Sequence, residues 1–107
     1  MLGDIVKVIV DRPLGSYHPQ FKDTLYTLNC GYIESIIAPD GEEQDAYILG
    51  VSEPLNEFTG KVIAIIHRFD DVEEKWVVAP IDKTYTKKEI ENSVHFQEKY
   101  FKIEIRM

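Results

Sequence analysis

The sequence predicts a mainly β protein with one C-terminal helix, in which five or six short strands form a closed or partly open barrel. Three observations lead to this fold class. Short runs rich in valine, isoleucine and aromatic residues recur through residues 4–79, with proline, glycine and asparagine between them. A helical pattern follows only after Pro80. Closure into a barrel would remove the exposed edges that so small a sheet would otherwise present.

The first strand is predicted at residues 4–11, because DIVKVIVD is rich in β-branched residues and has no helical cap. Residues 12–24 then break regular structure with two prolines and a glycine, and we expect a loop there. Further strand runs follow, separated by turn signals such as Pro39-Asp40-Gly41, at 25–28, 32–37, 44–51, 61–67 and 75–79.

Turn residues and a capping box bound the last elements. Residues 52–60 contain a proline and a glycine and precede the strand at 61–67. Residues 69–74 are predicted to form an acidic turn that joins the last two strands into a hairpin. The helix is predicted at 87–101, because Thr86-Lys87-Lys88-Glu89 has the Thr-x-x-Glu form of a capping box and apolar residues then recur near helical spacing.

One domain spanning residues 1–107 is expected, since a chain of this length has room for one hydrophobic core. The apolar N-terminal stretch is interrupted by Asp4, Lys7 and Asp11, which predicts neither a membrane span nor a signal peptide. Cys30 is the single cysteine, so an internal disulfide cannot form. We therefore expect a cytoplasmic protein with no membrane partner, and the sequence leaves a homo-oligomer open.

The formal net charge of −7 disfavours nucleic acid as a partner, because the nucleic-acid backbone is itself anionic. The acids are concentrated in two short clusters at predicted turns, where carboxylates can either be solvated or converge on a ligand. These clusters are Asp40, Glu42, Glu43 and Asp45, and then Asp70, Asp71, Glu73 and Glu74.

The first cluster has the residue types of a Mg²⁺ site. In an extended stretch Asp40 and Glu42 share a face, and the turn beside them can bring Asp45 to the same point. Mg²⁺ takes oxygen ligands at about 2.0–2.1 Å and keeps several waters, so a few carboxylates suffice. A solvated surface turn is the alternative. The order of the acids differs from that of an EF-hand loop.

The second cluster is followed by a lysine. Strand alternation makes Glu73 and Lys75 neighbours on one face. Acids that bind metals beside a lysine suit phosphoryl transfer, in which metals neutralise charge and a cation holds phosphate. Taken alone, this cluster too would be interpreted as a solvated turn.

The first cluster also resembles a family signature. Residues 40–47, DGEEQDAY, are similar to the Asp-Gly-Asp-Pro-Leu-Asp-Val-Leu signature of the soluble inorganic pyrophosphatases, with the same spacing of acids. Four further segments resemble motifs of that family in the same order along the chain: DRPLGS at 11–16, YTLNCGY at 26–32, EEKWVVAP at 73–80 and HFQEKY at 95–100. The resemblance covers nearly the whole chain.

The resemblance implies a five-stranded barrel of the OB type, with a cleft lined by carboxylates in which pyrophosphate is hydrolysed to two phosphates with Mg²⁺. Asp40, Asp45 and Glu73 would then be metal ligands. Either Asp70 or Asp71 would be a fourth ligand.

The same resemblance implies roles on the substrate side. Glu42 would help to activate the attacking water between metals. Lys75, as a catalytic cation, would hold phosphate oxygens together with Tyr32 and Tyr100. Asp11 would organise the cleft wall by hydrogen bonds.

The chain departs from the family on the side that would bind phosphate. The hairpin that carries the family's upstream lysine and arginine is compressed into residues 17–24. His18 and Lys22, with Arg12 nearby, are the residues that could replace those cations. Two acids are also exchanged for their homologues, since Glu42 and Glu73 stand where the family has aspartate. Fewer cations would weaken pyrophosphate binding and neutralise less charge on the leaving phosphate.

Two other functions therefore stand beside hydrolysis. One is a catalytically weak or inactive pyrophosphatase-like module that binds a metal or a phosphorylated metabolite. The other is a barrel that binds single-stranded nucleic acid, which would need a positively charged groove and is disfavoured by the net charge of −7. The expected partner is pyrophosphate or another small phosphorylated ligand.

Overall fold

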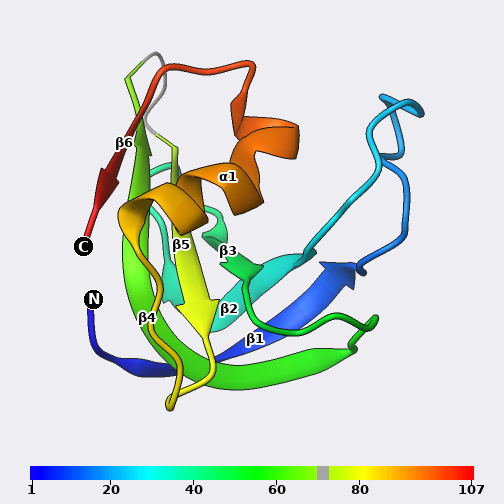
Figure 1. The fold of residues 1–107 in the computed structure, drawn as a ribbon. Helices are drawn as coiled ribbons and strands as arrows, with labels where there is room; N and C mark the ends of the chain where they lie inside the picture. The colour runs from blue at the N-terminus through cyan, green and yellow to red at the C-terminus, as the bar shows by residue number, and fades with distance from the viewer. Residues whose placement is uncertain (70–72) are drawn as a thin grey trace.

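Six strands and one helix make up the described part of the chain, residues 1–69 and 73–107 of a computed structural model (Figure 1). In chain order they are β1 (Ile5–Arg12), β2 (Asn29–Ile37), β3 (Glu43–Ile48), β4 (Glu57–Arg68), β5 (Glu74–Ala79), α1 (Lys87–Glu98) and β6 (Ile103–Arg106). The structure is therefore mainly β with one helix near the C-terminus, as the sequence predicts.

The first five strands close into a barrel. β1 pairs antiparallel with β2, β2 with β3, and β5 with β4, while β3 and β5 run parallel. The barrel closes because the first half of β4 pairs with β1, from Glu57 opposite Ile9 to Lys61 opposite Ile5. β6 then pairs with the second half of β4. The predicted five-stranded barrel is confirmed and is closed, and β6 is an addition to it.

Strand β4 has a row of inward side chains that begins in the apolar core and ends at a charged residue. From Gly60 to its last residue, every second position of β4 is buried. Val62, Ala64 and Ile66 are the apolar members of this inward row. The same alternation places Arg68 at the last buried position, because the side-chain period of a strand is two. A charged residue therefore ends an otherwise apolar row.

Helix α1 packs on the barrel through an apolar face. Its predicted capping box is confirmed, since Thr86 Oγ1 accepts from the Glu89 amide and the Glu89 carboxylate accepts from the Thr86 amide. Ile90 and Val94 are buried in an apolar cluster with residues of β3, β4 and β5. With 12 residues α1 is too short to cross a membrane, and no helix among the described residues is both long and apolar enough to do so.

Several of the predicted strand bounds were wrong: β2 begins at Asn29 and not at 32, and β3 ends at Ile48 and not at 51. Residues 25–28 form no strand, because the preceding loop takes their hydrogen bonds: the Tyr26 amide donates to Ser16 and the Tyr26 carbonyl accepts from Gly15. β4 begins at Glu57, since the residues predicted as a turn before 61 pair with β1.

The C-terminal region also differs from the prediction. The helix ends at Glu98 and not at 101. Phe101 lies outside it, and the ring centroid is 3.8 Å from the guanidinium carbon of Arg68. No element was predicted at residues 103–106, which form β6. The alternation of Ile103 and Ile105 with polar residues was a usable signal for this strand.

Gly31→Ala is expected to destabilise the barrel. Gly31 in β2 lies opposite Val10 in β1, and a Cβ atom there would come within 2.9 Å of the Val10 Cα. Forcing a side chain into such a contact costs about 1–3 kcal/mol, because the backbone must shift. Urea unfolding measures the loss. The control is Ser35→Ala at an exposed position of the same strand, which should stay within about 0.5 kcal/mol of wild type. Equal stabilities of the two variants would contradict the close approach.

Candidate functional site

A cleft of about 210 Å³ opens where the first three strands, β5 and the end of α1 meet. The buried Tyr26, Cys30 and Tyr47 line part of it. We call it the polar cleft after its charged and hydrogen-bonding side chains, which are those of Asp11, Arg12, His18, Asp45, Lys75 and Gln97.

Strand pairing places Lys75 beside Asp45 in this cleft. β3 and β5 run parallel with Ala46 opposite Trp76, so the residues before these two are neighbours. Lys75 Nζ lies 2.9 Å from Asp45 Oδ2 and 3.0 Å from Glu73 Oε1. The lysine side chain is only 15% exposed, so its ammonium group is held between two carboxylates. The prediction that Glu73 and Lys75 share a face is confirmed.

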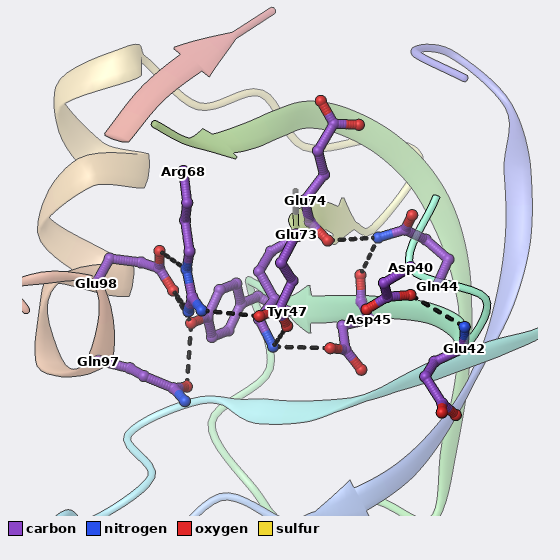
Figure 2. A network of polar contacts seen from close by, with 11 residues as sticks. Asp40, Glu42, Gln44, Asp45, Tyr47, Arg68, Glu73, Glu74, Gln97 and Glu98 are labelled. Atoms are coloured by element: carbon purple, nitrogen blue, oxygen red, sulfur yellow. Dashed lines mark hydrogen bonds and ion pairs between the residues drawn. The ribbon is translucent and has the colours of Figure 1, made fainter. Parts of the chain in front are cut away.

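The ion pairs continue from Glu73 toward the helix (Figure 2). Glu73 Oε2 lies 3.1 Å from Arg68 Nη1. Arg68 Nε donates to Glu98 Oε1 at 2.9 Å, and Arg68 Nη2 donates to Glu98 Oε2. The Tyr47 hydroxyl group also donates to Glu98 Oε2. Figure 2 shows Arg68 and Tyr47 both directed at the Glu98 carboxylate, so β3, β4 and α1 meet at this group.

Both cations of this network keep their charge. Burial opposes the charge of Lys75, but its interactions with Asp45 and Glu73 outweigh burial and raise the pKa of the ammonium group. Burial likewise opposes the charge of Arg68, and the hydrogen bonds to Glu98 raise the pKa of its guanidinium group. At neutral pH the network is therefore an alternating series of carboxylates and cations.

The structure separates the first acidic cluster. Asp40 and Glu42 lie exposed on the turn before β3, where Asp40 Oδ1 accepts from the Glu42 amide at 3.0 Å. Figure 2 shows the Asp40 carboxylate directed at this backbone group. Neither residue lines the polar cleft, whereas Asp45 does. Of this cluster, only Asp45 is brought to Glu73 and Lys75.

The residues predicted to bind substrate fall into three places. Asp11 and Arg12 line the polar cleft. Lys22 and Tyr100 line a second cavity beside it. Tyr32 lies opposite Asp45 in the pairing of β2 with β3 but lines neither of these two cavities. The predicted ligand Asp70, with its alternative Asp71, lies outside the described residues.

Sequence reasoning missed the buried half of the network, Arg68, Glu98 and Tyr47. The alternation in KVIAIIHR was a usable signal, because it places Arg68 on the same face as Val62, Ala64 and Ile66. A charged residue at such a position needs a buried partner. The sequence gives no comparable signal for Glu98, which stands among other polar residues of α1.

The described acids do not form a metal-binding group. The Lys75 ammonium group occupies the point at which the Asp45 and Glu73 carboxylates converge. Among residues 1–69 and 73–107, no three His, Cys, Asp or Glu side chains gather closely enough to hold a metal ion. Mg²⁺ needs several free oxygen ligands, and in this arrangement both carboxylates are already paired with the ammonium group. The role of Mg²⁺ stays a prediction.

Solved structures of bacterial inorganic pyrophosphatases have a similar fold. The enzyme from Ehrlichia chaffeensis superposes with a TM-score of 0.71 and 15% identity, over 97% of this chain and 85% of that one. The enzyme from Coxiella burnetii gives 0.67 and 16%, over 99% and 86%. That from Thermus thermophilus gives 0.62 and 17%, over 100% and 85%.

These similarities establish a pyrophosphatase-like barrel of the OB type, as predicted. No protein-family model matches the chain, and no curated protein matches its sequence. At identities of 15–17% the shared fold does not carry the activity with it, so function has to be argued from the site.

Arg68→Met is expected to lower the free energy of unfolding by about 3–5 kcal/mol, because it leaves the Glu98 charge buried without its main partner. The double variant Arg68→Met/Glu98→Met should be less destabilised than the single one, since neither charge then remains. Urea unfolding of both variants measures this coupling.

The matched control is Lys7→Met, which removes an ion pair with Glu57 whose side chains are 57% and 59% exposed. Such surface pairs contribute about 0–1 kcal/mol. Similar losses for Arg68→Met and Lys7→Met would show that the Arg68 pair does not anchor the helix.

Proposed function

We propose that this pyrophosphatase-like barrel binds pyrophosphate or another small phosphorylated molecule in the polar cleft. The state of Arg12 carries the proposal. Its guanidinium group lines the cleft and is oriented by a hydrogen bond from Nη1 to the Asp11 carbonyl, at 3.1 Å. Within residues 1–69 and 73–107, no carboxylate forms an ion pair with Arg12. Its charge is thus available to an anion.

The chemistry around Arg12 suits phosphate. A planar guanidinium group can donate two parallel hydrogen bonds to phosphate oxygens. Burial raises the pKa of the Tyr26 hydroxyl group, which therefore stays protonated and can donate as well. The Gln97 amide adds a neutral donor. These groups can hold an anion without a metal.

Lys75 contributes less to anion binding than its charge alone suggests. Asp45 and Glu73 already balance that charge at hydrogen-bonding distance. A phosphate group that approached Lys75 would also approach the Asp45 carboxylate, which repels it. We therefore assign the main role in binding to Arg12.

Mg²⁺-dependent hydrolysis of pyrophosphate, an inorganic diphosphatase activity, is the second candidate function. The convergence of Asp45 and Glu73 on one point favours it, because two carboxylates could share one cation there. The solved structures with a similar fold are named inorganic pyrophosphatases, which is the further support. In the described arrangement, the activity would require Lys75 to leave its position between these carboxylates.

Arg12→Met should weaken pyrophosphate binding by about tenfold or more, because a hydrogen bond to a charged group contributes about 1.5–3 kcal/mol. Isothermal titration calorimetry in the presence of EDTA measures the affinity without divalent metal. Lys88→Met removes a positive charge at an exposed position of α1 and serves as the control. The proposal fails if pyrophosphate does not bind wild type, or if the two variants lose affinity equally.

Phosphate release from pyrophosphate with excess Mg²⁺ separates the two candidates. If Lys75 keeps its place, bound pyrophosphate stays intact, and this is the outcome that we expect for wild type. Release that falls on the order of 10²-fold in Asp45→Asn would instead establish hydrolysis at this site. Thermal unfolding of the variant verifies that it is folded, so that a loss of release is not a loss of structure.

A further inference from the structure

A second cavity of about 530 Å³ adjoins the polar cleft. It is lined by the loop at residues 18–24 and by the end of α1 with the segment that follows it. Figure 1 shows this loop projecting from the barrel on the side of the helix. His18 and Gln97 line both cavities, so one ligand could extend from the polar cleft into the second cavity.

Three aromatic rings line the second cavity, which we call the aromatic cavity. Phe21 is 65% exposed and Tyr100 67%, while Phe101 is more covered. Phe21 comes from the loop, and Tyr100 comes from the segment after the helix. Large exposed aromatic side chains gathered in one hollow are typical of a binding site, because their burial by a ligand is favourable.

Hydrogen bonds within the loop fix the position of Phe21. His18 Nδ1 accepts from the amides of Gln20 and Phe21, both at 3.1 Å. The Thr24 carbonyl accepts from the His18 amide at 2.9 Å, and the Thr24 amide donates to the Phe21 carbonyl at 2.9 Å. The His18 and Phe21 rings lie 4.9 Å apart. The loop is therefore an ordered wall of the cavity.

We propose that the ligand is a nucleoside phosphate, with its phosphates bound by Arg12 in the polar cleft and its base stacked in the aromatic cavity. The inference rests on the proposed function and specifies its ligand class. A nucleobase offers a planar face to aromatic rings, and the side chains of Gln20, Thr24 and Gln97 can bond its polar edge.

The sizes of the two cavities agree with this division of the ligand. The aromatic cavity of about 530 Å³ lies within the range of about 300–1,000 Å³ for small-molecule sites. The polar cleft, with about 210 Å³, is too small for a whole nucleotide but suits its phosphate groups. Pyrophosphate alone would leave the aromatic rings uncovered. Lys22 adds a cation at the edge of the aromatic cavity.

The test compares ADP, ribose 5-phosphate and pyrophosphate by isothermal titration calorimetry in EDTA. Base stacking on aromatic side chains should make ADP bind about tenfold tighter than either ligand without a base. Phe21→Ala should remove this advantage, so that ADP no longer binds tighter than pyrophosphate. Tyr100→Ala should also weaken ADP binding, whereas Tyr100→Phe keeps the ring and should retain it.

Phe69→Ala is the control, because Phe69 is 58% exposed and lines neither the polar cleft nor the aromatic cavity. Equal affinities of wild type for ADP and pyrophosphate would overturn the nucleotide inference and leave phosphate binding intact. Loss of ADP selectivity in Phe69→Ala as well as in Phe21→Ala would also overturn it. No binding of any of the three ligands would overturn the proposed function itself.

Discussion

The buried interaction between Arg68 and Glu98 is the constraint on which the arrangement of the site depends. Arg68 ends the inward row of β4, where a charge without a partner would be very costly. Glu98, on the last turn of α1, supplies the compensating charge through two hydrogen bonds. The orientation of the helix on the barrel is thereby coupled to the end of β4, which leads toward Glu73 and Lys75.

The barrel could be predicted because its signals are local. Runs of β-branched and aromatic residues between turn signals identified the strands, and the capping box at Thr86 identified the start of the helix. The failures were also physical in origin. Residues 57–60 were predicted as part of the turn region that ends at Gly60, yet they pair with β1 and belong to β4. Tertiary pairing of this kind overrides local preference.

The site was predictable only where residues are close in sequence or share a motif. Glu73 and Lys75 are two positions apart, so alternation alone places them together. Arg68 and Glu98 are 30 residues apart, and only the closed fold reveals that they meet. The pairing of Lys75 with Asp45, 30 residues away, could not be predicted either, because a lysine beside acids can hold phosphate or can neutralise those acids.

Gln97 connects the Arg68–Glu98 interaction, which holds the helix on the barrel, to the two cavities. Gln97 precedes Glu98 in sequence, lines both cavities and has its side-chain oxygen 3.0 Å from the Tyr47 hydroxyl group. A ligand that contacts Gln97 thus recognises a chain whose helix is already docked. Ligand binding and helix docking are then thermodynamically linked. A ligand that contacts Gln97 in either cavity would favour the state in which α1 is docked on the barrel over states in which α1 is detached.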